Sequence, residues 1–188
     1  MPTQCLTNPQ LADEPISLAD LAAHLRRDIT AEQDYLATLI SAARADAEAI
    51  MGWPVCSSQF LQTEIGWADG IALSMQPVQS VQTVKYLDAT GTEQTLAGTE
   101  WRLQSANSKI VPAFGKTWPA TLVADDAVRV TYTAGYANPA SVPAPIKQWI
   151  KLRAAAFDLY REAWTEGRPI QKNEFIDRLL DAYKNWSI

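Results

Sequence analysis

Apolar and polar residues alternate along AVRVTYTAG (127–135) and then change to helical spacing within a short Pro-rich joint. An alternating segment of this kind places one set of side chains on each side of an extended chain, as a half-buried β-strand requires. The residues expected on the buried side are Val128, Val130 and Tyr132. Downstream, Pro145 stands where the first turn of a helix can begin, because its missing N–H costs nothing there. The pattern therefore predicts a strand that leads into a long, largely buried helix.

That helix is predicted from IKQWIKLRAAAFDLY (146–160), where apolar residues recur at a spacing of three to four. The residues expected in the core from this spacing are Ile146, Trp149, Ile150, Ala154, Phe157 and Tyr160. Gly167 and Pro169 then interrupt the pattern, and a final helix is predicted over about 171–186.

The first half of the chain shows two helix starts. Residues 1–16 contain three prolines and are predicted to be an irregular arm, after which Ser17 and Asp20 form a capping-box pattern for a short helix. Thr30 and Gln33 repeat that pattern and predict a longer helix to about residue 51. The apolar stripe of this longer helix is Leu36, Leu39, Ile40, Ala43, Ala47 and Ile50, and its outward residues are Glu32, Thr38, Arg44 and Glu48.

Between these helical regions the period changes from about 3.6 to 2. Short alternating runs separated by Gly, Pro and Asp turn signals predict strands at 60–65, 71–75, 78–88, 92–96, 101–104 and 109–114. Short strands at roughly ten-residue spacing are typical of a small antiparallel sheet or barrel. The expected class is therefore α+β, with helices at 17–52 and 144–188 forming one helical domain and an antiparallel unit inserted at 53–143.

Composition fits a globular protein. The 188 residues are 47% hydrophobic and only 20% charged, unlike a disordered chain. No run approaches the roughly 18 apolar residues of a membrane span, and the N-terminus lacks the pattern of a secretory signal. Cys5 and Cys56 have no paired spacing, which favours free thiols.

Charge is distributed unevenly, and this limits the possible partners. The first 51 residues carry eight acids against three arginines, whereas residues 144–188 carry eight bases against six acids. A protein that grips DNA phosphates usually has a basic surplus, yet the net charge here is −5. The opposed ends could instead face each other, within one subunit or between subunits.

Candidate chemistry is sparse. The single histidine, His24, falls off the apolar stripe of its helix, and two unpaired cysteines do not make a zinc site. No phosphate-binding glycine loop or nucleophile elbow is present. We therefore expect no catalytic residues, no cofactor and no metal. Trp164 and Trp186 stand at predicted helix ends beside polar residues, where aromatic side chains can form interfaces.

Five segments in order resemble a known family. They are LISAARADAEAIMG (39–52), PVQSVQTVKYLDATGTEQTL (77–96), TWPAT (117–121), VRVTYTAGY (128–136) and VPAPIKQWIKLRAAAFDLYREAW (142–164). Their order and spacing resemble the head–tail connector proteins (head-completion adaptors) of long-tailed bacteriophages, in the subgroup with a β-insertion between helices. The likeness spans about residues 17–165; the Pro-containing N-terminal arm has no match in that pattern.

The resemblance implies a structural virion protein without catalytic residues. Such proteins form a ring, usually of twelve subunits, on the portal vertex; the ring extends the DNA channel and docks the tail or a stopper protein. The implied location is the virion head–tail junction, reached from the bacterial host cytoplasm during assembly, with DNA passing through the channel without sequence-specific binding and no membrane partner.

Two surfaces are expected to serve that role. An acidic channel lining would repel DNA and let it slide, whereas a basic lining would hold the phosphates by counterion release. The candidates for this lining are Asp28, Glu32, Asp34, Asp46 and Glu48. The candidates for a basic or aromatic interface between subunits are Lys147, Lys151, Arg161, Trp164, Arg168, Lys172 and Trp186.

Two other functions remain open on the sequence. One is a non-viral interaction module that uses the β-unit to bind a partner, and the other is a small-molecule-binding α+β enzyme with a hidden pocket. The first predicts a monomer or dimer instead of a ring, and the second predicts polar groups clustered in a deep pocket.

Overall fold

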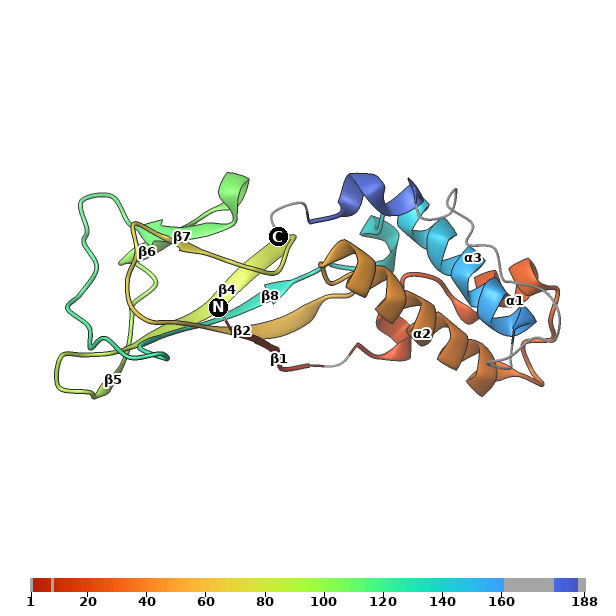
Figure 1. Ribbon diagram of the computed structural model, residues 1–188, viewed down its shortest axis with the longest axis horizontal. Coiled ribbons are helices and arrows are strands. Elements are labelled where there is room, and N and C mark those ends of the chain that lie inside the picture. The colour runs from red at the N-terminus through yellow and green to blue at the C-terminus, as the bar shows by residue number, and fades with distance from the viewer. Residues whose placement is uncertain (1, 8, 161–177, 186–188) are drawn as a thin grey trace, which may run out of the picture. The chain divides into compact units, whose positions relative to one another are not determined.

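The strand expected at 127–135 is the central strand of a sheet in the computed structural model, which describes residues 2–7, 9–160 and 178–185. This strand, β8 (Val128–Ala134), lies in the middle of a five-stranded antiparallel sheet (Figure 1). The strands of this sheet, in spatial order, are β1 (Thr3–Cys5), β2 (Ser58–Glu64), β8, β4 (Val78–Leu87) and β5 (Glu93–Thr95). A second antiparallel sheet has the order β3 (Ile71–Ala72), β7 (Lys109–Pro112) and β6 (Trp101–Gln104).

The alternation in β8 has the structural consequence that the sequence predicts. Val128, Val130 and Tyr132 are fully buried, and the intervening residues are only half-buried. Val130 lies opposite Gln62 of β2 and Val84 of β4. The buried side chains of both sheets form one apolar cluster, so this cluster is the core that fixes the register of the strands.

A polar group completes that core. The side-chain amide of Gln62 is fully buried, and its Nε2 donates to the carbonyl of Ala72 at 2.8 Å while its Oε1 accepts from the backbone N–H of Ser74 at 2.9 Å. The Tyr132 hydroxyl accepts from the N–H of Met75 at 3.1 Å. These bonds satisfy groups that would otherwise be costly to bury, and they tie β2 to the chain after β3.

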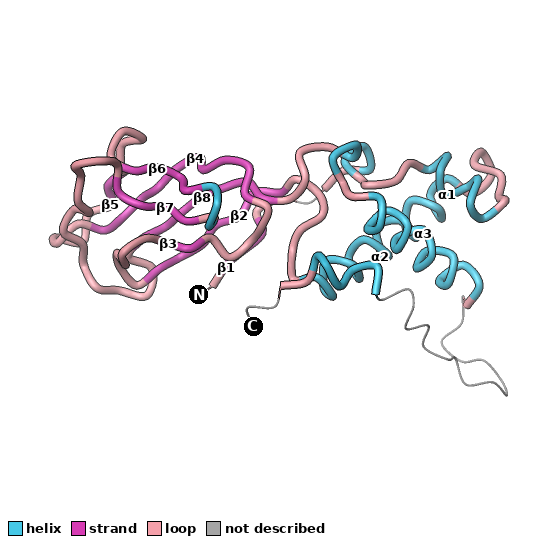
Figure 2. The backbone as a smooth tube through the Cα atoms, turned by 90° about the horizontal axis from the view of Figure 1, so that it is seen from above, coloured by secondary structure: helices cyan, strands magenta, loops and turns pink. Residues whose placement is uncertain are grey.

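The chain divides into two compact units, one that contains the strands and one that contains the long helices (Figure 2). The sheet unit is Met1–Asn8 with Ser57–Gly135, and the helical unit is Pro9–Cys56 with Tyr136–Ile188. The prediction of an α+β fold is confirmed. The unit boundaries fall at Ser57 and Gly135, inside the expected insertion at 53–143.

The N-terminal arm differs from the expectation. Residues 1–16 are not irregular throughout, because Thr3–Cys5 form β1 and pair with β2 at the edge of the sheet. A 3-10 helix follows at Leu11–Asp13, and Ile16 is buried in the helical core. Three prolines disfavour long regular elements, but they leave room for a three-residue edge strand, where few N–H groups are needed.

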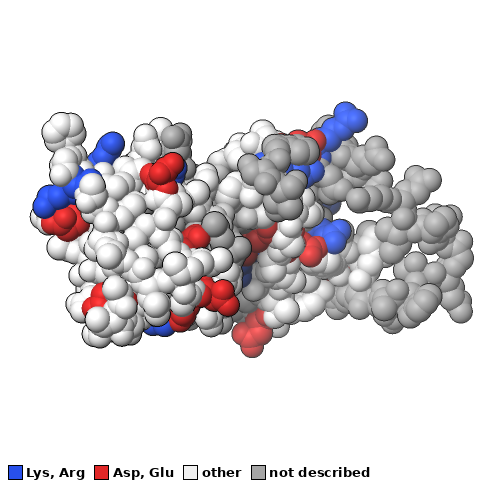
Figure 3. Space-filling model, turned by 60° about the vertical axis from the view of Figure 1, so that its left-hand side comes forward, with Lys and Arg blue, Asp and Glu red and all other residues white. Residues whose placement is uncertain are grey.

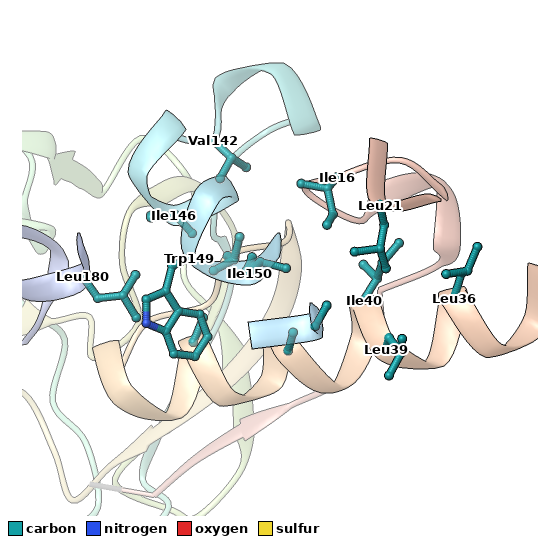
Figure 4. Close-up of a cluster of buried hydrophobic side chains, with 14 of the residues drawn as sticks. Ile16, Leu21, Leu36, Leu39, Ile40, Val142, Ile146, Trp149, Ile150 and Leu180 are labelled. Atoms are coloured by element: carbon teal, nitrogen blue, oxygen red, sulfur yellow. The ribbon is translucent and has the colours of Figure 1, made fainter. Parts of the chain in front are cut away.

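Within the described residues, the helical unit contains the α-helices α1 (Leu18–Leu25), α2 (Gln33–Met51) and α3 (Ala144–Leu159). The Ser17 hydroxyl accepts the N–H of Asp20 at 3.1 Å and the Asp20 carboxylate accepts the N–H of Ser17 at 3.3 Å, so the predicted capping box is confirmed. At the end of α2, Gly52 has φ +73° and its N–H bonds to the carbonyl of Glu48. Figure 4 shows Trp149 of α3 pointing toward α2, with Leu180 beside it.

Several helix predictions need correction. The second capping box is wrong: α2 begins at Gln33, and Thr30 instead donates its N–H and hydroxyl to the Asp28 carboxylate in a local turn. Tyr160 lies beyond the end of α3 and is 43% exposed, so it is not a core residue. Ile50 is also exposed, although the helical stripe includes it.

The final helix is shorter within the described residues. A 3-10 helix covers Arg178–Tyr183, and its Leu180 is fully buried against the helical core. In the rest of the predicted range, residues 184–185 are not helical, and residues 171–177 and 186 lie outside the described residues.

Candidate functional site

Three of the five predicted acidic channel residues are paired with arginines of the same chain. Glu32 lies 3.3 Å from Arg27, Asp46 lies 2.7 Å from Arg153, and Glu48 lies 2.6 Å from Arg44. An ion pair largely cancels the field of its carboxylate at a distance, so Asp46 gives little net negative potential. Arg27 and Arg44 each bind a second carboxylate as well, so the groups that contain Glu32 and Glu48 each keep a formal net charge of −1. The other two members of the set, Asp28 and Asp34, are exposed, and no ion pair joins them to another of the described residues.

The pairs have structural roles that the sequence does not reveal. Arg27 joins the end of α1 to α3, because it also binds the Asp158 carboxylate at 3.0 Å. Arg153 lies over the Phe157 ring, 4.9 Å from its centroid, while it holds Asp46 of α2. The acidic surface of α2 is thus partly a means of attaching α2 to its neighbours.

Two buried charged residues, Glu14 and Arg44, form a cluster with the half-buried Glu48. Arg44 Nε donates to Glu14 at 3.0 Å, and the second oxygen of Glu48 accepts the backbone N–H of Val55 at 2.8 Å. Burial raises the pKa of the Glu14 carboxyl above its ordinary value, and the Arg44 guanidinium opposes that shift. The sequence predicts Arg44 on the outer face of its helix, but the residue is only 8% exposed, and the Glu14 carboxylate from the segment before α1 lies against its guanidinium.

The same cluster affects Cys56. The Cys56 thiol donates to the carbonyl of Asp13 at 3.2 Å, and burial raises the pKa of the thiol to about 12. Cys5 and Cys56 are both free, as expected, but a thiol with so high a pKa is unreactive at neutral pH. The cluster is therefore a structural joint between the N-terminal segment and α2.

The predicted basic interface lies only partly within the described residues. Lys147 and Lys151 sit on α3 and are half-buried, and both help to lower the pKa of Asp20, after the larger effect of the Ser17 hydrogen bonds. The other members of the set, Arg161, Trp164, Arg168, Lys172 and Trp186, lie outside the described residues.

The β7–β8 loop of the sheet unit carries exposed apolar side chains that the sequence pattern does not reveal. The pattern predicts Phe114 at the end of a strand over 109–114, but β7 ends at Pro112 and the Phe114 side chain is 102% exposed. In the same loop, Leu122 and Val123 are 41% and 81% exposed. We call these three residues of the β7–β8 loop the apolar tip.

The backbone of the apolar tip is held by specific bonds. The N–H of Ala113 donates to Glu100 at 2.9 Å, and Lys116 closes the turn by pairing with the Glu100 carboxylate at 2.9 Å. Further along, Trp118 stacks on Trp67 with 4.4 Å between ring centroids. A large apolar side chain that is presented on an anchored turn is a typical anchor for a protein interface. Only its exposure to water distinguishes Phe114 from a core residue, and a sequence does not show exposure.

Charged side chains on the face drawn in Figure 3 are scattered among uncharged ones, and the described residues show no continuous area of one sign there. In the described part of the chain, no group of three His, Cys, Asp or Glu side chains is arranged to hold a metal ion. His24 is exposed near the end of α1.

None of the helices in the described residues combines the length and apolar character that a bilayer crossing needs.

Comparison with known proteins gave matches by structure alone. No family model matches the sequence, and no curated protein matches it. The fold is similar to that of a chain in the neck of an empty gene transfer agent (GTA) particle computed with C6 symmetry, with a TM-score of 0.77 and 24% identity. It is also similar to a chain in the neck of a native GTA particle computed with C12 symmetry, with a TM-score of 0.74 and 23% identity. A chain in the virion of a native GTA particle is similar as well, with a TM-score of 0.75 and 23% identity.

Each of these matches covers 100% of this chain and 97% of the other. The fold expected from the sequence resemblance is therefore a fold found in the neck of such particles.

Proposed function

We propose that this protein is a non-enzymatic structural component of a virion neck, a head–tail connector that assembles as a ring. The observation that carries the proposal is the likeness over 100% of this chain and 97% of the similar chains, which includes the helical unit, the sheet unit and the arm that contains β1. The similar chains belong to particle necks computed with sixfold and twelvefold symmetry, which supports a ring of twelve copies. A closed ring of this kind needs two different surfaces on each copy that fit each other.

The expected partners follow from that place in the particle. The ring would sit on the portal protein at the head–tail junction, extend the DNA channel and dock the tail or a stopper protein. DNA would pass without sequence-specific binding. Of the acidic candidates for the channel, Asp28 and Asp34 carry the proposal, since arginines of the same chain hold the side chains of the other three. Assembly would take place in the bacterial host cytoplasm before the finished particle carries the ring.

We propose the surfaces between subunits from the charges of the helical unit and from the exposed apolar side chains of the sheet unit. Lys147 and Lys151 on α3 are candidates to meet the acidic start of α2 of the next copy. Ion pairs at an exposed rim are screened at about 1 M salt, where the Debye length is only about 3 Å. A ring that depends on them should dissociate as salt rises toward that value, whereas a ring that is unchanged at high salt would exclude closure by charge.

The experiment that tests the function is a determination of the oligomeric state. Light scattering and negative-stain imaging of the purified chain, alone and with a portal ring, should show twelve-membered rings in at least the second sample. A monomer or dimer in both samples would favour a non-viral interaction module. Saturable binding of a metabolite by that same species would favour a small-molecule-binding enzyme.

We expect Phe114→Ser to weaken ring assembly without weakening the fold. Phe114 is fully exposed, so the free energy of unfolding should change by less than about 0.5 kcal/mol. If the apolar tip is an anchor, its loss should raise the protein concentration needed for half-assembly at least tenfold, as a contact of about 2 kcal/mol implies. Urea unfolding and light scattering measure the two effects.

Phe60→Ser is the control for the unfolding measurement, because Phe60 is a buried aromatic residue of the same unit at 6% exposure. The free energy of unfolding of the Phe60→Ser protein should be strongly reduced. Unchanged assembly of Phe114→Ser would place the apolar tip outside the contact between subunits.

A further inference from the structure

Strand β1 is attached to the sheet almost entirely through its backbone. It pairs with β2 through Thr3, Gln4 and Cys5, and the ladder continues outward where the N–H of Leu6 donates to Gln59 at 2.8 Å. At its other end, the N–H of Thr63 donates to the carbonyl of Pro2 at 3.2 Å. Within residues 2–7 the side chains are exposed or half-buried, and Leu6 is 45% exposed. Little apolar burial therefore opposes the release of this strand.

The edge of β2 is nevertheless specific for this strand. The Thr3 hydroxyl lies 2.7 Å from that of Ser74, which in turn donates to the buried amide of Gln62 at 2.7 Å. The Thr7 hydroxyl accepts the N–H of Gln59 at 2.9 Å. These contacts fix one register for an extended segment with Thr at two defined positions.

We now use the word arm for residues 2–7 alone, and the residues that follow them are anchored in the helical unit. The carbonyl of Asp13 accepts the Cys56 thiol, Glu14 binds Arg44, and Ile16 is buried. Residues 1–8 belong to the sheet unit, and the helical unit starts at Pro9. The arm is thus an element that can change its acceptor strand while both anchored regions keep their own contacts.

We propose that β1 is an exchangeable strand, and that in the assembled ring residues 2–7 of each copy pair with β2 of the adjacent copy in the register seen here. This inference rests on the proposed ring. A head-to-tail ring needs a donor surface and a different acceptor surface, and the arm and the β2 edge already fit each other. Around a closed ring every acceptor is filled, so the β2 edge is covered in every copy.

In the single chain, the same pairing covers the acceptor. An open β2 edge would invite uncontrolled strand addition, and the chain's own arm prevents this before assembly. Exchange replaces each hydrogen bond by an identical one, so the ladder itself favours neither state. The remaining contacts between copies and the high local concentration in a ring decide the outcome. The inference therefore predicts a monomer that is kept from open-ended association and a ring that is linked by its arms.

The test uses two chains that each carry one introduced cysteine, because neither can form the tested disulfide within one chain; the native Cys56 is buried and stays in both. Gln4 and Leu61 are register partners on the exposed side of the sheet, so Gln4→Cys and Leu61→Cys place two thiols within reach of each other. Both chains also carry Cys5→Ser, since the native Cys5 is an exposed free thiol beside the site. Equal amounts are mixed, assembled into rings on a portal ring and oxidised, and the products are separated without reductant.

Exchange predicts disulfide-linked dimers of one chain of each kind. About a quarter of the arm–edge junctions in a random mixed ring bring the two cysteines together. The matched control mixes Gln4→Cys with Thr131→Cys, because Thr131 pairs with Leu61 from the far side and lies one strand further from the arm. Two strand spacings are about 10 Å, which is too long for a disulfide, so this mixture should stay uncross-linked.

The outcomes separate this inference from the function on which it rests. Rings that form without mixed dimers, while a chain with both Gln4→Cys and Leu61→Cys closes an internal disulfide, would show that the arm stays on its own sheet; the exchange would be wrong and the ring would stand. Absence of rings from the unmutated chain under the same conditions would overturn the proposed function and the exchange with it.

Discussion

Val130→Asp is expected to leave no folded protein in the soluble fraction. Val130 is fully buried at the centre of β8, between Gln62 of β2 and Val84 of β4. A carboxylate at this position would have no partner in an apolar core, and the cost is on the order of 5 kcal/mol. That is comparable to the whole stability of an ordinary domain, so the sheet unit should not fold. Soluble yield and the circular dichroism of the purified fraction measure the loss.

Thr131→Asp is the matched control, because it introduces the same group one residue along the same strand. Thr131 lies on the other face of the sheet and is half-buried. This variant should be soluble and lose no more than about 1 kcal/mol. A soluble, folded Val130→Asp protein would mean that the core is not where the alternation of β8 puts it.

Arg44→Met should be the second severe change, although its target is charged. Arg44 is buried between Glu14 and Glu48, and its removal leaves two carboxylates close together without a cation. Removal of one partner from a buried ion pair typically costs roughly 3–5 kcal/mol. Urea unfolding at neutral pH, followed by circular dichroism of the helices, measures the change in the free energy of unfolding.

The loss should depend on pH in a defined direction. The pKa of Glu14 is already raised by burial, and Arg44→Met removes the guanidinium that opposes the rise. A carboxyl with a raised pKa in the folded state binds its proton more tightly there than in the unfolded chain. Stability therefore falls as pH rises from the ordinary pKa through the raised one. The variant should be closest to the unmutated protein near about pH 4 and furthest from it at about pH 7.

Two further variants identify the cause. Arg153→Met removes an arginine from an exposed pair with Asp46 and should cost at most about 1 kcal/mol. Glu14→Gln combined with Arg44→Met should recover part of the loss, because one of the two stranded charges is gone. If Arg153→Met were as harmful as Arg44→Met, the damage would come from loss of arginine packing in general, and burial of the charge would not be its cause.

The candidate surfaces were only partly predictable, and the reason is the same for each. Asp46 and Glu48 can be recognised as acidic helix residues from the sequence, but their pairing depends on Arg153 and Arg44, of which one comes from a different helix. Phe114 has the pattern of a strand end, and only the turn at Ala113–Lys116 directs it toward water. Net charge and exposure at a surface are properties of groups brought together from distant parts of the chain.

Local sequence patterns alone determined the elements whose residues follow a regular spacing or a capping motif. The alternation of β8, the capping box at Ser17 and the helical stripe of α3 are local patterns, so the amino-acid sequence by itself specifies the α+β class and most of the strands. Tertiary structure alone decided the pairing of the three-residue strand β1 with β2, the burial of Arg44 and the exposure of the apolar tip. A strand of three residues is too short to show periodicity. In the sequence, a charged residue that will be buried cannot be told from an exposed one, because the residues that cover it come from elsewhere in the chain. Local patterns specify the elements, and long-range contacts specify the surfaces with which this protein meets other chains.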